Sequence, residues 1–310
     1  MRRFVTVTLN PAIDETVMLE HLHPGKVHRA SAVTFYAGGK GVNVAGCLAD
    51  WGAEVVASGI LGRGNAPVFE AFFAAKGIED RFMRVAGETR TNIKLSHDGD
   101  TTDINLPGLL ISAEEAERIF EIVLVLGGKD TLVLLGGSLP EGIESGFYAR
   151  MIAPLRAQGA RVVLDTSGAA LSRVLEGDAL PFCIKPNRAE LEAYVGHALD
   201  DDAALIAVAR GLIARGLELV VVSLGALGAL FVTAEASLRA ALPPLRVAST
   251  VGAGDAMVAG ILAALDGGAE LEGIARLATA FAAGKLQQGG ANLPERRIVE
   301  ALYKDVEIRN

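Results

Sequence analysis

The chain of 310 residues has few cysteines and little charge for its length. Its two cysteines, Cys47 and Cys183, are far apart and lie in apolar contexts, which argues against a disulfide framework or a zinc site and favours buried free thiols. Charged residues make up only 21% of the chain, yet no segment is polar enough to suggest disorder. Because 51% of the residues are hydrophobic, the chain can bury a sizeable core.

Long uninterrupted apolar runs are also missing. The run LVVVSLGALGALFV is broken by glycines and falls short of the roughly 18 apolar residues of a membrane helix. The first residues, MRRFVTVTLN, enter a strand-like pattern and lack the apolar segment of a signal peptide, so we expect a cytoplasmic protein. The net charge of −8 argues against non-specific nucleic-acid binding, although a few local cations could still bind an anionic substrate.

Short runs rich in valine and leucine recur along the chain and are apolar on both faces, which is typical of buried parallel strands. Helical patterns lie between them, and one opens with Ser112 and Glu115 at the spacing of a capping box. This alternation predicts an α/β fold with helices on both faces of a mostly parallel sheet. The predicted strands are FVTVTL, EVVASGIL, DTLVLLGG, RVVLDTSG, FCIKPN and LELVVVSLG.

Two segments, at about 10–40 and 88–108, break this alternation. The first contains no good helix, and the second alternates apolar and polar residues around Asp98-Gly99, a strong hairpin signal. We therefore expect a small β-sheet inserted in one domain that spans 1–310. Such a sheet could act as a lid, or it could pair with another subunit to protect its edges.

The stretch STVGAGDAMVAG places Gly252 and Gly254 just before Asp255 and a run of small, apolar residues. Asp255 could cap a helix, which is common at helix starts. Alternatively, bare glycine backbone at a helix start forms an anion site, and the aspartate could take a proton from a nucleophile. The other glycine loop, AGGKGVN, lacks the spacing of a P-loop. Either loop alone is more often a tight turn.

Seven polar loops are more informative together, because several of them directly follow a predicted strand. In an open α/β sheet such loops meet at the carboxyl edge, where ligands bind. They are TLNPAID, GGKGVN, TRTN, GSLP, KPNRAE, SLGALG and STVGAGD.

With these motifs the chain resembles the ribokinase-like carbohydrate kinases of the phosphofructokinase B type, from TLNPAID to LPERRIV. AGGKGVNVA and STVGAGDAMVAG resemble the two signature regions of that family. The resemblance implies a three-layer α/β/α sandwich, a homodimer formed through the small β lid, and transfer of a phosphoryl group from ATP with Mg²⁺. TLNPAID and TRTNIKL are similar to the branch that acts on sugar phosphates. D-fructose 1-phosphate is the expected substrate, with tagatose 6-phosphate and fructose 6-phosphate as alternatives.

The resemblance also implies roles for single residues. Asp255 would be the catalytic base, and the amides of Gly252, Ala253 and Gly254 would hold the transferring phosphoryl group. Arg90 would bind the phosphate already on the sugar. The other residues implied on the substrate side are Asp14, Gly38, Gly39, Lys40, Asn43, Ser138 and Lys26. For Lys26 an ordinary solvated lysine is an equally good interpretation.

On the nucleotide side, Asn187 and Glu190 match an N-x-x-E element that would position Mg²⁺, through water. A helix cap with the same two residues remains an alternative. A plain turn is likewise a rival for the SLGALG loop. The further residues implied for the nucleotide are Lys185, Ser223, Gly225, Gly228, Gly254, Gly284 and Gln288. A sugar-phosphate-binding protein without catalysis is the second class of function that the motifs allow.

Overall fold

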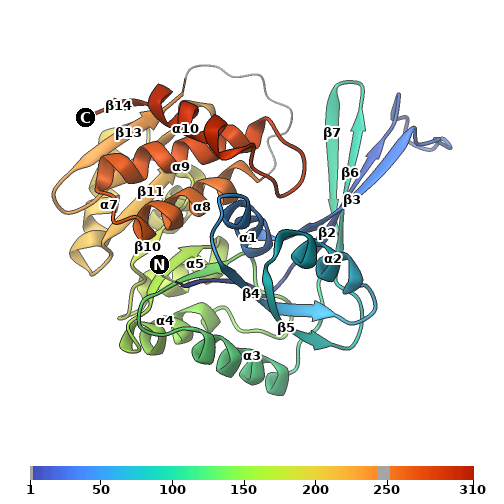
Figure 1. Ribbon diagram of the computed structural model, residues 1–310, viewed down its shortest axis with the longest axis horizontal. Coiled ribbons are helices and arrows are strands. Elements are labelled where there is room, and N and C mark those ends of the chain that lie inside the picture. The colour runs from blue at the N-terminus through green and yellow to red at the C-terminus, as the bar shows by residue number, and fades with distance from the viewer. Residues whose placement is uncertain (1–2, 243–251) are drawn as a thin grey trace.

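The computed structural model describes residues 3–242 and 252–310 and shows a ten-stranded sheet between two layers of helices (Figure 1). From β11 to β5 all neighbouring strands are parallel, whereas β12, β13 and β14 add antiparallel strands at one edge. In spatial order the strands are β14 (Glu307–Arg309), β13 (Ser237–Ala241), β12 (Ala229–Val232), β11 (Leu219–Ser223), β10 (Cys183–Ile184), β9 (Arg161–Asp165), β8 (Thr131–Gly136), β1 (Arg3–Thr8), β4 (Val55–Gly62) and β5 (Glu79–Val85).

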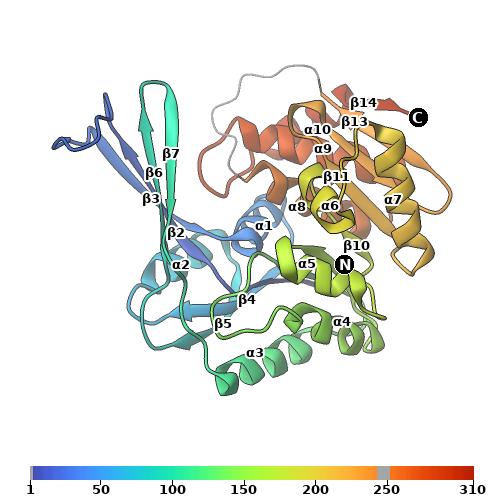
Figure 2. The ribbon, with the colours of Figure 1, turned by 180° about the vertical axis from the view of Figure 1, so that it is seen from behind.

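Two apolar clusters hold the layers together, one on each face of the sheet. On β1, Phe4 belongs to one cluster and Val5 and Val7 to the other, as the alternation of side chains along a strand requires. The helices of the first face are α1 (Lys40–Asp50), α2 (Pro67–Lys76), α8 (Ala253–Asp266), α9 (Leu271–Leu286) and α10 (Arg296–Asp305). Those of the second face are α3 (Ala113–Leu126), α4 (Phe147–Ala157), α5 (Gly168–Glu176), α6 (Arg188–Val195) and α7 (Asp202–Ala214), several of which are in front in Figure 2.

Local signals fix two of the helix ends. Ser112 and Glu115 form the expected capping box at the start of α3. The chain leaves α7 at Arg215, and Gly216 follows with a φ of 119°.

Both cysteines are buried and free, as expected. No described helix is long and apolar enough to span a membrane. The α/β class with a mostly parallel sheet is confirmed.

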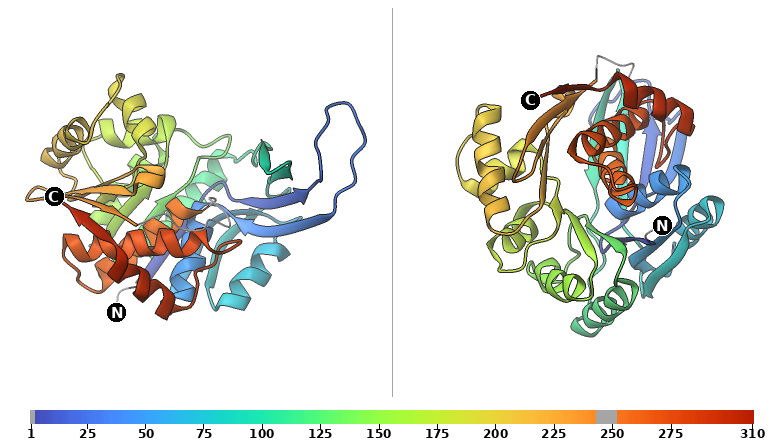
Figure 3. Two further views of the ribbon diagram at one scale, coloured as in Figure 1. Left: turned by 90° about the horizontal axis from the view of Figure 1, so that it is seen from above. Right: turned by 60° about the vertical axis from the view of Figure 1, so that its left-hand side comes forward.

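A second, four-stranded sheet projects from the main body (Figure 3). Asp98 and Gly99 form the tight turn of its β6–β7 hairpin with φ values of 52° and 80°, as the Asp-Gly pair predicts. Strands β2 and β3 come from the first irregular segment, and β6 and β7 come from the second. In spatial order the strands are β3 (Ala32–Gly38), β2 (Ala12–Met18), β6 (Thr91–His97) and β7 (Asp100–Asn105).

Candidate active site

The predicted loops meet where the parallel strands end and where α1 and α8 begin. Asn43, in the first turn of α1, donates from Nδ2 to Oδ2 of Asp255 in α8 at 2.7 Å. Lys40, the first residue of α1, donates to Oδ1 of Asp165 at the end of β9 at 2.9 Å. Residues separated by more than a hundred positions thus form one polar cluster, which lies at the edge where ligands bind in such folds.

Asp255 is the third residue of α8, whose N-cap is Gly252 with a φ of 81°. An L side chain is strained at that φ, so the glycine allows the turn that exposes the first amides of α8. The alternative that Asp255 is itself the cap is wrong for this structure. Burial raises the pKa of Asp255, and the nearby Asp165 raises it further, whereas Lys40 and the bond from Asn43 oppose this shift. A carboxylate with a raised pKa at a helix start is suited to accept a proton.

Asp165 is a site residue that the sequence analysis missed. It is only 1% exposed, and its Oδ1 lies 2.9 Å from Nζ of Lys40 and 3.4 Å from Nζ of Lys185. Its Oδ2 is buried and has no partner among the described residues. The available signal was an aspartate that ends an apolar strand, in VVLD, because such a position lies at the ligand-binding edge.

A second polar group forms around Asp14 in β2. Oδ1 of Asp14 accepts a bond from Asn92 at 3.1 Å, and a Cβ on Gly38 would lie 2.2 Å from its Oδ2. Burial raises the pKa of Asp14, although Asn92 and the charges of Lys94 and Arg90 oppose the shift. Burial in turn lowers the pKa of Arg90, and its Nε has no partner among the described residues. A carboxylate and a guanidinium therefore lie together, a pair that suits a polyol with an anionic end.

Two predicted substrate residues are placed differently. Ser138, just after β8, accepts a bond at 3.0 Å from Nδ2 of Asn10, which lies within TLNPAID. Lys26 is exposed in the loop between β2 and β3, where its amide bonds to His23. Since β2 runs away from Asp14 towards this loop, the structure does not bring Lys26 together with Asp14 within one chain.

Asn187 and Glu190 form a reciprocal capping box at the start of α6. The amide of Glu190 donates to Oδ1 of Asn187, and the amide of Asn187 donates to Oε2 of Glu190, each at 2.8 Å. The cap interpretation therefore describes this structure, and each side chain keeps further lone pairs for water. The charge of Glu190 acts on Lys40, so the element faces the same cluster as Asp165.

The remaining predicted nucleotide residues have evident structural roles. Gly228 has a φ of 89°, and a Cβ there would lie 2.0 Å from the carbonyl oxygen of Ala240, as expected for the turn after β11. Gly284 packs on Pro294, and the carbonyl of Gln288 accepts a bond from Lys285. Ser223 and Gly225 lie at the end of β11 and in the short helix that follows it, close in sequence to this turn.

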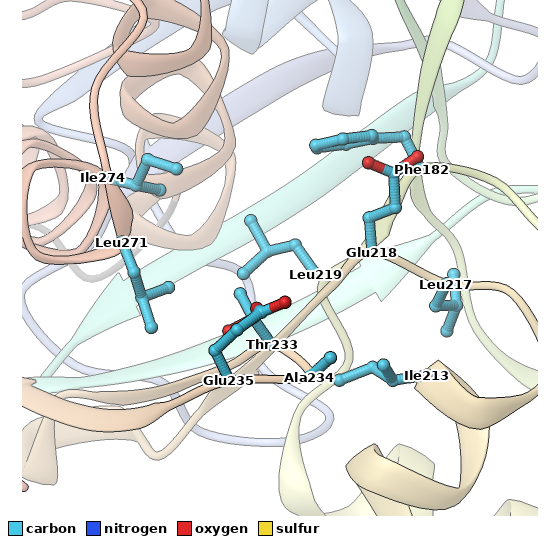
Figure 4. A pocket seen from close by; sticks show the side chains of 10 residues that line it. All are labelled: Phe182, Ile213, Leu217, Glu218, Leu219, Thr233, Ala234, Glu235, Leu271 and Ile274. Atoms are coloured by element: carbon cyan, nitrogen blue, oxygen red, sulfur yellow. The ribbon is translucent and has the colours of Figure 1, made fainter.

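A cavity of about 410 Å³ lies at the opposite edge of the sheet (Figure 4). It is lined by Leu217 and Glu218 just before β11 and by Leu271 and Ile274 at the start of α9. The cavity therefore lies at the amino end of β11, whereas Asp255 lies at the opposite side of the sheet, where the parallel strands have their carboxyl ends. The candidate site is the polar cluster and not this cavity.

The family model of the pfkB family carbohydrate kinases matches residues 7–297. The chain belongs to this family. Among curated relatives, the 1-phosphofructokinase of Xanthomonas campestris pv. campestris is 54% identical, over 97% of this chain and 95% of its own length. The 1-phosphofructokinase of Rhodobacter capsulatus is 42% identical, over 99% and 98%. Phosphofructokinase-2 from Escherichia coli, solved in complex with fructose-6-phosphate, is similar in structure with a TM-score of 0.89 and 28% identity, over 98% of this chain and 99% of its own.

Proposed function

We propose that this chain transfers the γ-phosphoryl group of ATP to the 6-hydroxyl of D-fructose 1-phosphate. The observation that carries the proposal is the position of Asp255, next to the first amides of α8 and within a cluster of lysines. The names of two curated relatives favour this sugar phosphate over the others.

In the proposed reaction Asp255 accepts the proton of the 6-hydroxyl as that oxygen attacks the γ-phosphorus. The bond from the γ-phosphorus to the bridging oxygen breaks, and ADP leaves. The amides of Gly252, Ala253 and Gly254 stabilise the negative charge on the transferring group, and the N-terminal end of α8 adds its dipole. Lys185 lies beside Gly254: a Cβ built on that glycine would be 3.6 Å from Nζ of Lys185.

The sugar is held by the second polar group. Asp14 accepts bonds from sugar hydroxyls, and Gly38 and Gly39 let the sugar approach the backbone. Asn43 donates to Asp255 and keeps its carboxylate in place. Arg90 binds the 1-phosphate, and a guanidinium can do so with two parallel bonds. Lys40 and Ser138 are proposed as further donors to the substrate.

A magnesium ion fits the donors that face the lysine cluster. Asp165 offers a buried, unpartnered carboxylate oxygen, and Glu190 and Asn187 offer oxygens for bound water. Mg²⁺ prefers oxygen ligands and keeps several waters, so this sparse set is sufficient. When bound, the ion would neutralise charge on the phosphate oxygens.

The small sheet is proposed as a lid and as the contact between two subunits of a homodimer. Asp14 lies on β2, so this sheet reaches from the sugar site outward. Exposed apolar side chains on it, among them Phe35, Tyr36 and Ile104, favour burial against a second copy.

A substrate comparison tests the proposal. Fructose 1-phosphate, fructose 6-phosphate and tagatose 6-phosphate are each offered with ATP and magnesium, and ADP release is measured. We expect kcat/KM to be highest with fructose 1-phosphate, by about 10-fold or more. A polar contact that one substrate makes and another lacks typically changes kcat/KM by at least this factor. A preference for another sugar phosphate would overturn the substrate, and binding of all three without ADP release would favour a non-catalytic protein.

A further inference from the structure

Lys285 is a buried lysine that the reaction described above does not use. It lies in the last turn of α9, and it is 3% exposed. Among residues 3–242 and 252–310, its Nζ donates one hydrogen bond, to the carbonyl oxygen of Gln288 at 3.1 Å. An ammonium group has three donors, so this single bond leaves donor capacity free.

No described carboxylate forms an ion pair with this ammonium group. The residues outside the described part, 1–2 and 243–251, read MR and PPLRVASTV and contain no aspartate or glutamate. Burial lowers the pKa of Lys285, and the charge of Asp255 opposes that shift. A buried cation without a counter-ion is unfavourable, which suggests that its counter-ion is a ligand.

The geometry places Lys285 beside the start of α8. A Cβ built on Gly252 would lie 3.2 Å from its Cε and 3.9 Å from its Nζ. The same point is 4.0 Å from Oδ2 of Asp255. The Nζ of Lys185 lies beside Gly254, two residues further along the chain than Gly252. The amides at the start of α8 are therefore flanked by one lysine near Gly252 and another near Gly254.

The side-chain charges of this cluster balance. Its cations are Lys40, Lys185 and Lys285, and its carboxylates are Asp165, Asp255 and, at the start of α6, Glu190. The N-terminal end of α8 adds roughly half a positive charge. An anion at the start of α8 would therefore meet the helix dipole and two lysine side chains, of which only Lys185 has a carboxylate within ion-pair distance among the described residues.

We propose that Lys285 is a positioning residue that binds the polyphosphate chain of the nucleotide at the start of α8. This inference rests on the proposed function for the identity of the nucleotide. The competing role, a lysine that only caps the end of α9 through Gln288, requires neither the proximity to Gly252 nor the position beside Asp255.

The test compares Lys285→Gln and Lys285→Arg with the unchanged protein, and Lys304→Gln on the exposed end of α10 serves as the matched control. Dissociation constants for ATP, ADP and AMP are measured by calorimetry. We expect Lys285→Gln to weaken ATP binding by about 10- to 100-fold, ADP binding less and AMP binding hardly at all, since a charge-assisted bond to phosphate is lost. Lys285→Arg should recover most of the loss, and Lys304→Gln should bind as the unchanged protein does.

Two outcomes would overturn the inference. One is ATP binding that is unchanged in Lys285→Gln, and the other is an equal loss for all three nucleotides, which a purely structural lysine would cause. Melting temperatures of both variants are recorded, and the Lys285→Arg protein keeps the comparison valid if the glutamine variant folds poorly. If the unchanged protein binds ATP but phosphorylates no sugar phosphate, the proposed function fails while this binding series still decides the role of Lys285.

Discussion

At the scale of single residues, the decisive feature is the pairing of carboxylates with lysines around α8. Asp165 holds two lysines, and its remaining oxygen has no partner among the described residues. Asp255 has a raised pKa because it is buried and lies near Asp165. The two aspartates thus differ in their surroundings: Asp165 pairs with two lysines, whereas Asp255 forms no ion pair among the described residues and is the one proposed as the base.

Replacing Asp255 by asparagine should separate binding from catalysis. Asparagine keeps the size of the side chain but cannot accept the proton, so we expect kcat to fall by about 100-fold or more. Dissociation constants for ATP and the sugar phosphate should change by no more than a few-fold. Because burial opposes ionisation of this carboxyl group, the melting temperature should stay the same or rise. Turnover near that of the unchanged protein would remove Asp255 from the role of base.

The pH dependence provides a check on the same residue. Asp255 acts as a base only when it is deprotonated, and its pKa is raised in the folded protein. The rate should therefore fall on the acidic side as the pH decreases through this raised pKa, at a higher pH than an exposed aspartate would give. The residual activity of the asparagine variant should lack this acidic limb.

At the scale of elements, small residues let α8 and α9 approach closely at the middle of α8. A Cβ on Gly260 of α8 would lie 2.6 Å from Cα of Ala278 and 2.8 Å from the carbonyl oxygen of Leu277 on α9. Both contacts are with backbone atoms, so no side chain could rotate to make room. The spacing of these two helices is therefore set at Gly260.

The variant Gly260→Ala should be less stable by about 1–3 kcal/mol, because the helices must separate to admit the methyl group. Chemical denaturation measures this change. Gly211→Ala on α7 is the matched control, since a Cβ there meets nothing within 4 Å. That substitution should be neutral or stabilising by up to about 1 kcal/mol, because alanine is the better helix former. Equal stability of the two variants would contradict the packing argument.

At the scale of the whole molecule, the small sheet is the part that we propose as the contact with a second copy. Its strands carry exposed apolar side chains, and Phe35 on β3 is 58% exposed. The sheet projects from the main body and has β3 and β7 as open edges (Figure 3). An isolated sheet with apolar faces and open edges favours association with a second copy.

The variant Phe35→Glu should therefore convert a dimer into a monomer at micromolar concentration, because a buried charge without a partner is unfavourable in an interface. Light scattering measures the molar mass. Val125→Glu on α3 is the control, since Val125 is also apolar and is 83% exposed, but far from this sheet. An unchanged protein that is already a monomer under these conditions would exclude the dimer.

The sequence by itself predicted the buried strands, the hairpin and most residues of the candidate site, since these predictions depend on local patterns. Apolar runs predicted the buried strands. Ser112, Asp98-Gly99 and Gly252 each set the backbone conformation of a cap or turn only a few residues long, so the local sequence is enough to show their effect. The family motifs located Asp14, Asn43 and Asp255, and the structure brings Asn43 and Asp255 together.

Only the tertiary structure decided which charges meet. Lys40 and Asp165 are 125 positions apart, and the strand order of the sheet places them within 2.9 Å. Lys285 approaches Gly252 because α8 and α9 pack against each other, and Lys26 is separated from Asp14 because β2 runs outward. Local spacing contains no information about such distances, because they depend on how burial of the whole core orders the strands and helices.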